Sequence, residues 1–491
     1  MAEGVVDVPV FKNAQGNDSD SEQAVSYPVH WFRSTICQVI VVGGVFFCAP
    51  GMYNALTSLG AGGLASPWWA NATSAAGYVF MGLYCLIGGI IVSKIGVRWA
   101  LLISSTGDII YSGSLYLNSK NGTEWFLMFG SIISGCTDGL MYTVEGPIIT
   151  GAFMIELQTR SVIYAVFFHS AYPEPDRRGR MLGLWVFMRN AAPVIGGAII
   201  FGLNHSTDSS GGVSLETYLV IIGIMCAGPF IALLLSPPEK VQRRDGVRIV
   251  MRKAGWVQTF TEWYRVVSNR DILLLCPLFF TSWFYGSYIG TLQTQFYTVR
   301  VRALCSLVIP FGDILGGFAI GYFLDCKLMS VKQRARWSFI AVMTFNLALW
   351  VWAAIITKQL EDQNPVIDWT SAMFGRTFSL FILFDFATMA TQTSLYWIIS
   401  HMSDDFVVLS YMTGILRGVE CAGQAVAYGI KSSDTTNWLS IGLNIGLIVL
   451  SLPFAWVTIR KIGVVEFDRT VLDQSSADEK SLEDEKITST A

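Results

Sequence analysis

The stretch EPDRRGRMLGLWVFMRNAAPVIGGAIIFG, from Glu174 to Gly202, decides the fold class. Arg177, Arg178 and Arg180 precede an apolar run that is long enough to cross a bilayer as a helix. Because positive charges resist translocation, a basic cluster at the start of such a helix marks its cytosolic end. The stretch therefore predicts a membrane-spanning helix that begins inside the cell and carries one arginine, Arg189, within its apolar run.

The composition of the whole chain also favours a membrane protein. Of 491 residues, 52% are hydrophobic and only 14% are charged, with a mean hydropathy of +0.48, which leaves too little polar surface for a soluble globule of this size. The net charge of -3 argues against nucleic-acid binding. The cysteines form no CxxC pair, so we expect no metal site, cofactor or disulfide framework. No nucleophile, base and orienting group recur at catalytic spacing, so we do not expect an enzyme.

Twelve apolar segments, each near the ~20 residues that a spanning helix needs, are distributed along the chain. The expected segments are Thr35 to Ala61, Thr73 to Val92, Trp99 to Leu117, Trp125 to Gly151, Met181 to Leu203, Tyr218 to Leu235, Ile272 to Leu292, Ala303 to Leu324, Trp337 to Ile356, Phe378 to Ile399, Phe406 to Ile430 and Trp438 to Ile459. They predict an all-α, polytopic membrane protein with two six-helix bundles, residues 35–235 and 272–459. A basic linker, 236–271, joins the bundles, and tails cover 1–34 and 460–491.

The placement of lysines and arginines predicts the orientation. If the chain starts inside, the cytosolic segments carry most of its 33 basic residues, so both termini are expected in the cytosol. The glycosylation sequons at Asn71, Asn121 and Asn204 then fall in outer loops, whereas the sequon at Asn17 stays inside. These features predict a glycosylated multi-pass protein of the plasma membrane or an endomembrane.

Between the second and third segments the chain reads GGIIVSKIGVRWALL, which resembles the inner-loop motif of the major facilitator superfamily. The residues of the motif are Gly89, Ser93, Lys94, Gly96 and Arg98. Ser93 stands where that motif usually has an aspartate. The eighth segment ends GGFAIGYFLDCKLMSVKQRAR, again a glycine-rich helix end before a basic loop, so the halves echo each other as the facilitator architecture requires.

Four longer phrases resemble the uncoordinated-ninety-three-like family, a branch of that superfamily. They are PGMYNALTSLGAGG from Pro50, YTVEGPI from Tyr142, YPEPDRRGR from Tyr172 and YWIISHMSDDFVVLSYMTGILRGVECAGQAVAYG from Tyr396. The resemblance implies a facilitator-like fold. Members are described either as presumed transporters or as partners that regulate channels or escort receptors. Two functions therefore stay open: a secondary transporter of a small anionic or polar solute, and a non-transporting partner of another membrane protein.

One segment departs from the family pattern. Residues 152–171, AFMIELQTRSVIYAVFFHSA, lie where the resemblance runs almost directly from the fourth segment into YPEPDRRGR. Their apolar core is too short to cross a bilayer, and an added crossing would move the arginines at 177–180 outside. An interfacial helix, a loop insertion and translated non-coding sequence all remain open for this segment.

Charged residues inside the apolar segments are the candidate functional residues, because a charge near the bilayer centre costs ~2.5–3.5 kcal/mol on insertion scales. Arg189 lies ~13 Å above Arg180 along its helix, within reach of Glu145 on the preceding antiparallel helix. In the second half, Arg417 is expected to pair with Asp385 or Glu420. Such pairs either line a solute pathway or hold helices in register.

Three further aspartates in apolar segments, Asp108, Asp138 and Asp313, have no obvious cationic partner in the sequence. Each is expected to be protonated and buried, to face water in a cavity, or to carry a proton.

Overall fold

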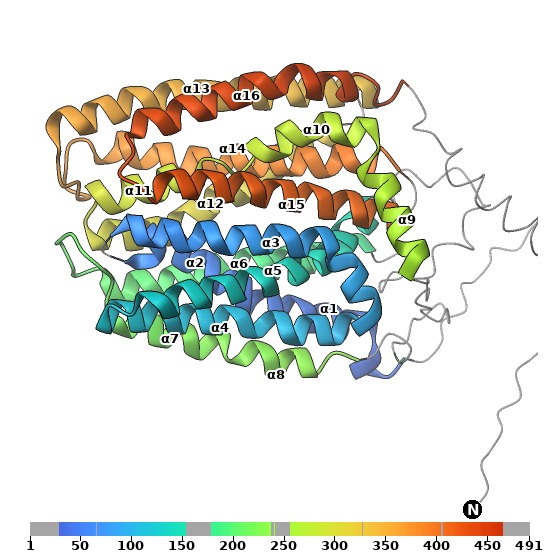
Figure 1. The fold of residues 1–491 in the computed structure, drawn as a ribbon, viewed down its shortest axis with the longest axis horizontal. Helices are drawn as coiled ribbons and strands as arrows, with labels where there is room; N and C mark the ends of the chain where they lie inside the picture. The colour runs from blue at the N-terminus through green and yellow to red at the C-terminus, as the bar shows by residue number, and fades with distance from the viewer. Residues whose placement is uncertain are drawn as a thin grey trace, which may run out of the picture.

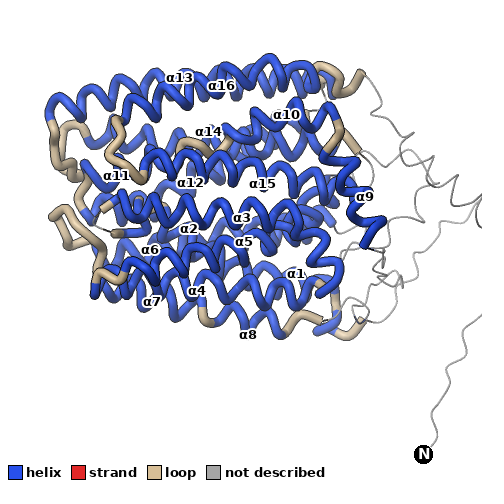
Figure 2. Tube along the Cα trace, viewed as in Figure 1, coloured by secondary structure: helices blue, strands red, loops and turns tan. Residues whose placement is uncertain are grey.

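The computed structural model describes residues 29–64, 66–153, 178–236, 240, 256–326, 328–403 and 406–464. Its helices run roughly side by side along one axis (Figure 1). Figure 2 shows helices joined by loops, and the described residues contain no strand beyond one isolated bridge between Tyr297 and Ile367. The all-helical fold class predicted from the sequence is confirmed.

We call residues 29–236 the N-region. Its helices are α1 (Thr35–Phe46), α2 (Met52–Thr57), α3 (Pro67–Ile95), α4 (Val97–Asn121), α5 (Glu124–Phe153), α6 (Arg178–Asn204), α7 (Leu215–Met225) and α8 (Ala227–Leu233), with short turns η1 (Trp31–Arg33), η2 (Phe47–Gly51) and η3 (Ala61–Gly63). The turn η2 joins α1 to α2 as a widened helical turn that contains Pro50, whose missing N–H favours such a bulge.

Residues 256–464 form what we call the C-region. Its helices are α9 (Trp256–Val267), α10 (Arg270–Thr281), α11 (Gly286–Phe296), α12 (Val299–Leu324), α13 (Val331–Gln363), α14 (Phe374–Ser400), α15 (Phe406–Lys431) and α16 (Asn437–Ile459). Ser330 and Gln333 form a capping box that starts α13. Helix α9 lies within the segment that the sequence predicts as a linker, 236–271, so part of that segment is helical.

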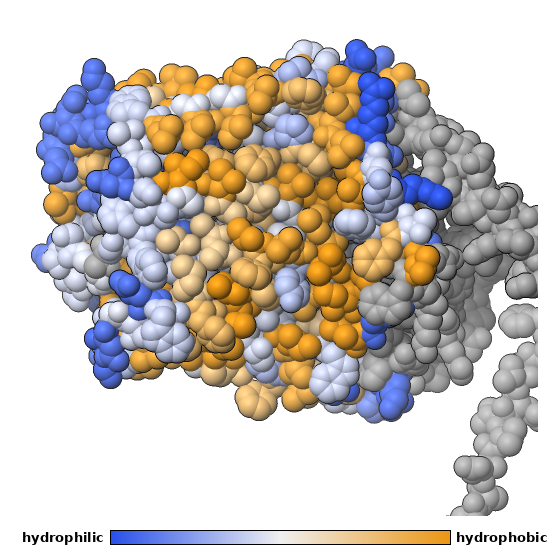
Figure 3. Space-filling model, in the orientation of Figure 1, coloured by the Kyte–Doolittle hydropathy of each residue, from blue (hydrophilic) through white to orange (hydrophobic). Residues whose placement is uncertain are grey.

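The middle of the bundle is apolar on its surface. Figure 3 shows a band of hydrophobic side chains between two hydrophilic ends on the face in view, the pattern expected where lipid covers a protein. Among the described residues, eight helical segments are long and apolar enough to cross a membrane. They are Ile36–Thr57, Pro67–Val92, Leu215–Leu233, Arg270–Phe296, Val299–Leu324, Val331–Gln363, Phe374–Ser400 and Asn437–Ile459. The longer helices α4, α5, α6 and α15 lie beside them (Figure 1).

The two regions meet mainly where α3 packs against α15 and α6 packs against α12. Both contacts depend on glycine. A Cβ at Gly197 of α6 would stand 2.2 Å from the carbonyl oxygen of Ser306 in α12, and a Cβ at Gly82 of α3 would stand 3.1 Å from the carbonyl oxygen of Gly418 in α15. The backbones approach this closely only because these side chains are absent.

Several helices begin earlier than the sequence indicates, and the early starts of α3 and α12 affect the sites described below. Helix α3 starts at Pro67, a residue that suits the first turn of a helix because it has no N–H to satisfy, so Asn71 is helical. Helix α12 starts at Val299, because the first N–H groups of that helix find acceptors: Val299 donates to the carbonyl of Ser209 and Arg300 to that of Thr207, both at 3.0 Å.

The start of α1, helix α9 and the end of α16 lie at one end of the bundle (Figure 1). We call this the terminal end, and the opposite end, where α12 begins, the far end. The first and last residues of the described chain therefore lie at the same end of the bundle.

Candidate functional site

Arg417 of α15 lies in the interior, at the contact between the two regions. Its Nη1 is 3.0 Å from Oε2 of Glu420, one turn along the same helix, and its guanidinium carbon is 4.3 Å from the ring centre of Tyr142 in α5. The Glu420 side chain is fully buried, and the Nε of Arg417 has no hydrogen-bond partner. The pair thus belongs to the C-region but contacts the N-region through an aromatic ring.

Further hydrogen bonds complete the surroundings of Glu420. Its Oε1 accepts from the Ser282 hydroxyl at 2.8 Å, and its Oε2 accepts from the Gln392 amide at 3.3 Å. The Gln392 oxygen in turn accepts from the indole N–H of Trp283 at 2.9 Å. Glu420 therefore has both a cation and hydrogen-bond donors, which together offset the cost of burying its negative charge.

Asp385, the other sequence candidate for Arg417, has a different neighbour. Its Oδ1 accepts from the Tyr285 hydroxyl at 2.7 Å, and the Tyr285 ring stacks on Phe384. The structure therefore places Arg417 against Glu420 and Asp385 against a tyrosine. Asp313 lies half-buried on α12.

A pair of aspartates in the N-region is arranged very differently. The Ser134 hydroxyl of α5 lies 3.0 Å from Oδ1 of Asp108 in α4 and 3.2 Å from Oδ2 of Asp138, one turn along α5. Asp108 is 0% exposed and Asp138 is 5% exposed. The second oxygen of each carboxyl, Oδ2 of Asp108 and Oδ1 of Asp138, has no hydrogen-bond partner. Neither aspartate makes a salt bridge among the side chains that the structure describes.

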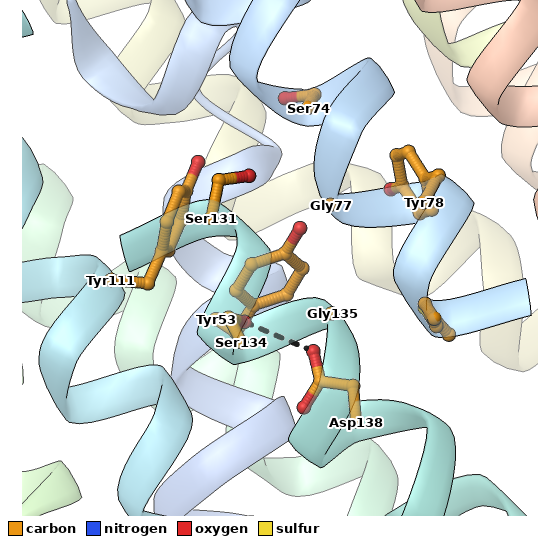
Figure 4. A pocket seen from close by; sticks show the side chains of 10 residues that line it. Tyr53, Ser74, Gly77, Tyr78, Tyr111, Ser131, Ser134, Gly135 and Asp138 are labelled. Atoms are coloured by element: carbon orange, nitrogen blue, oxygen red, sulfur yellow. Dashed lines mark hydrogen bonds between the residues drawn. The ribbon is translucent and has the colours of Figure 1, made fainter. Parts of the chain in front are cut away.

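A small cavity adjoins this pair (Figure 4). Its lining comes from α2, α3, α4 and α5, and consists of three tyrosines, three serines, two glycines, a methionine and Asp138. These residues are Tyr53, Ser74, Gly77, Tyr78, Met81, Tyr111, Ser131, Ser134, Gly135 and Asp138. The Tyr78 ring stacks on Tyr428 of α15 at 5.3 Å, so one wall of the cavity abuts the C-region. The lining offers hydroxyl groups, aromatic faces and one carboxyl.

The predicted pair of Arg189 and Glu145 lies outside the side chains that the structure describes. Their helices, α6 and α5, are described and contact each other. Residues 152–171 fall almost entirely outside the described range, apart from the end of α5.

The inner-loop motif forms the turn between α3 and α4 at the terminal end. Gly96 takes φ +82°, which lets α3 end and α4 start at once. The Arg98 guanidinium donates to the Leu233 carbonyl at 2.8 Å and ties α4 to the end of α8. Gly89 faces Tyr411 of α15, Lys94 is exposed, and the Ser93 side chain is outside the described set.

Arg302 is a functional candidate that the sequence analysis missed. It is fully buried near the start of α12, and its partners are backbone carbonyls of the N-region. Its guanidinium donates to Leu59 and Gly60 at 2.8 Å, to Leu64 at 3.1 Å, and to Gly211 at 2.8 Å. We call this set of bonds the Arg302 clasp.

The turn that receives Arg302 is the glycine-rich end of the phrase PGMYNALTSLGAGG. Residues 60–63 all have positive φ, between 49° and 83°, which turns several carbonyls toward one point. Three of these residues are glycines, for which such angles carry no steric penalty. Paired charges in a sequence signal contacts between side chains, but nothing in a sequence marks a backbone carbonyl as a partner.

A second contact lies beside the clasp at the far end. The Arg300 guanidinium binds both carboxyl oxygens of Asp368, in the loop between α13 and α14, and covers the Trp369 ring at 4.5 Å. This hydrogen bonding holds the pKa of the Asp368 carboxyl well below its usual range. Trp369 also contacts Phe201 of α6 edge to face. The far end is thus closed by contacts between the two regions.

Two of the three predicted glycosylation sites are buried. Asn71 is 3% exposed, and its amide donates to the Thr291 hydroxyl and the Lys431 carbonyl. Asn204 is 0% exposed and donates to Ile200 and Thr217. Asn121, at the end of α4, is exposed. A glycan at Asn71 or Asn204 would have to break these buried bonds, because its linkage uses the same amide nitrogen.

Comparison with known proteins gives relatives along most of the chain, although no protein-family model matches it. A protein of Aspergillus versicolor named notoamide biosynthesis cluster protein O' is 35% identical over 439 residues, which cover 89% of this chain and 91% of that protein. UNC93-like protein 1 of Arabidopsis thaliana is 27% identical over 435 residues, which cover 86% of this chain and 89% of that protein.

Solved transporters share the fold at low sequence identity. A D-xylose–proton symporter covers 88% of this chain and 98% of its own, with a TM-score of 0.54 and 12% identity. A POT family transporter covers 86% of this chain and 96% of its own, with a TM-score of 0.57 and 14% identity. Both belong to the major facilitator superfamily, so the chain is a multi-pass membrane protein with that fold. Together with the relatives along its length, this establishes that the chain belongs to the UNC93-like family.

Proposed function

We propose that this protein is a secondary transporter that moves a small polar solute by alternating access. Twelve transmembrane helices would form two six-helix halves, residues 35–235 and 272–459, that rock around a central site. The observation that carries the proposal is the buried Arg417 and Glu420 pair, which touches Tyr142 of the other region. Tyr142 packs in one cluster with Tyr78 and Met81, two residues that line the cavity.

The chemistry of the cavity favours a polar solute. Hydroxyl groups of tyrosine and serine both donate and accept hydrogen bonds, and tyrosine rings supply apolar faces. The positive charge of Arg417 is balanced by Glu420, so the interior offers little net attraction to an anion. We therefore narrow the expected solutes from anionic or polar to polar.

The far-end contacts support alternating access. The Arg302 clasp and the N–H groups of Val299 and Arg300 hold the N-region loops against α12. Opening this end requires those bonds to break together, as expected for one of two discrete states. We infer that the far end faces outside and the terminal end the cytosol.

The direct test is solute flux into vesicles that contain the purified full chain. We would offer D-xylose, a nucleoside, a dipeptide and neutral amino acids, each radiolabelled, and compare uptake with that of empty vesicles. Saturable uptake of one solute supports transport. Uptake equal to that of empty vesicles for every solute contradicts it.

The alternative function is a non-transporting partner of a channel or receptor. It is favoured by the completeness of the Glu420 hydrogen bonds, which require no solute. A cysteine at Ser74, which lines the cavity, separates the two functions. A transporter should change the labelling rate of Ser74→Cys with an impermeant thiol reagent when solute is added, relative to the parent chain. Constant labelling with stable co-purification of another membrane protein favours the partner function.

The orientation has its own test. If the far end is outside and the chain passes the secretory pathway, we predict a glycan at Asn121 and none at Asn17, Asn71 or Asn204. Peptide mapping after glycosidase treatment reports each position. A glycan at Asn17 would reverse the inferred orientation.

A further inference from the structure

We propose that Asp108, Ser134 and Asp138 form a proton-binding site that exchanges its proton with the cavity, and that this proton is the coupling ion of transport. The coupling role rests on the proposed transport function, whereas the binding of the proton does not. Three features of the site support the proposal: the single hydrogen of the serine hydroxyl, the lack of a cation among the described neighbours, and the access that the cavity gives.

The Ser134 hydroxyl has too few hydrogens to donate fully to both aspartates. The Ser134 hydroxyl carries one hydrogen, yet its oxygen lies within hydrogen-bonding distance of a carboxyl oxygen on each side, 3.0 Å to Asp108 and 3.2 Å to Asp138. The hydroxyl can donate to only one of them. Two full hydrogen bonds form when one of the two carboxyls is protonated and donates to the serine oxygen while the hydroxyl donates to the other carboxyl, and this is the state that we propose.

The surroundings require the same proton. Two ionised carboxylates at one buried site repel each other, and such a pair retains a proton unless a cation neutralises it. The described titratable groups that interact with the pair are Tyr53 of α2, Tyr111 of α4 and Cys421 of α15. Tyr78 of α3 lines the adjoining cavity and stacks on Tyr428 of α15. None of them is basic. The side chains of Glu145 and Arg189 are outside the described set.

The cavity supplies the route. Asp138 lines it, is 95% buried, and has one carboxyl oxygen, Oδ1, with no partner (Figure 4). Asp108 is not among the lining residues, and its side chain contacts Ser134 and Asp138. A proton from a hydronium ion in the cavity would therefore reach Asp138 first, and the hydroxyl of Ser134 would accept it and pass its own hydrogen to Asp108. The pair, which already shares one proton, then holds two, so its charge changes from −1 to 0 and the hydronium ion becomes water.

Ser134 acts here as a positioning residue, and the two aspartates bind the ion. The first test needs no solute: infrared spectra of the full chain in lipid nanodiscs, titrated with pH. We expect the carbonyl band of a protonated carboxylic acid at neutral pH, lost in the double variant Asp108→Asn with Asp138→Asn. Ser134→Ala should move its titration midpoint, and Ser134→Thr, which keeps the hydroxyl, should restore it. Glu124→Gln, an exposed carboxyl on the same helix, is the matched control.

The second test measures coupling in vesicles with whichever solute of the panel is taken up. An inward proton gradient should raise accumulation by the wild type ~10-fold or more, and should have no such effect on Asp138→Asn, which should still exchange solute across the membrane. Fluorescence-detected gel filtration verifies that the variant is folded.

Each contrary outcome has a distinct meaning. If no neutral-pH acid band is assigned to the pair, the proton site is wrong whatever the flux. If the wild type takes up solute equally with and without a proton gradient, the coupling role is wrong and transport stands. If sodium chloride removes the band and a sodium gradient drives uptake, the site binds sodium instead. Absence of all uptake contradicts transport, and the coupling role falls with it.

Discussion

The interiors of the two regions treat buried charge in opposite ways. In the C-region, Arg417 and Glu420 neutralise each other, and Glu420 receives further hydrogen bonds from Ser282 and Gln392. In the N-region, Asp108 and Asp138 have one hydroxyl between them and each has an oxygen without a partner. Burial of charge alone therefore does not identify a proton site. The unpartnered carboxyl oxygens beside a cavity are what led us to propose one at Asp108 and Asp138.

The largest effect is expected at the Arg417 and Glu420 pair. Glu420→Gln leaves the Arg417 charge buried without an anion, and breaking a buried pair in this way typically costs ~3–5 kcal/mol. The amount of monodisperse protein should fall sharply, and adding Arg417→Met should restore part of it because the stranded charge is gone.

Asp385→Asn is the matched control for that change. Asp385 is also a carboxylate on a helix of the C-region, but its hydrogen-bond donor is the Tyr285 hydroxyl, from which an asparagine oxygen can still accept. Its yield should stay closer to that of the parent. If Glu420→Gln and Asp385→Asn are equally abundant and stable, the pair contributes no more than a single hydrogen bond, and the contrast between the regions is lost.

The second effect concerns the clasp that joins the regions. Arg302→Met removes four hydrogen bonds from a charged guanidinium to backbone carbonyls. Amide hydrogen exchange in residues 60–64 should accelerate by ~10-fold or more. Arg300→Gln, which affects a more exposed pair on the same helix, should accelerate it less. Unchanged exchange in Arg302→Met would show that the turn holds its shape without the arginine.

A smaller, pH-dependent effect is expected at Asp368. Because Arg300 lowers the pKa of this carboxyl, the pair stabilises the fold above the ordinary aspartate pKa of ~3.9, and this contribution is lost as the pH falls through the lower pKa of the folded protein. Thermal unfolding should therefore distinguish the wild type from Asp368→Asn at pH 7, and the two should converge only below about pH 4. Convergence near neutral pH would contradict the assigned cause.

The smallest effect should occur in the incomplete pair. Asp108→Asn replaces an acid that shares a proton with a neutral side chain of the same shape, whose amide can donate to Ser134. Its unfolding temperature should change less than that of Glu420→Gln. A loss as large as that of Glu420→Gln would mean that Asp108 is ionised and balanced by a cation, which removes the basis for a shared proton.

Local features were predictable from the sequence. The helices follow apolar runs of spanning length, and Arg417 and Glu420 are three residues apart, a spacing that brings side chains together on any helix. The sequence also drew attention to Asp108 and Asp138 as aspartates without a cation.

Contacts between distant parts of the chain were not predictable in the same way. Ser134 as the bridge depends on how α4 packs against α5. The burial of Asn71 depends on α3 starting at Pro67 and on partners in α11 and α15. Arg302 directly precedes the expected segment Ala303 to Leu324 and drew no attention, because its acceptors come from two turns of the N-region that only the folded chain assembles.

The Arg302 clasp has a consequence for how this family can vary. Its acceptors are main-chain oxygens, so substitutions of the side chains at Leu59 or Leu64 leave the oxygen atoms that Arg302 binds in place. Mutational tolerance in the turn should therefore follow backbone angles instead of side-chain chemistry. Gly62 and Gly63, at φ +59° and +83°, should resist replacement by any branched residue. A mutational scan that is interpreted from side-chain contacts alone would overlook the backbone partners of this fully buried arginine. A scan that also replaces the glycines of the turn would reveal them.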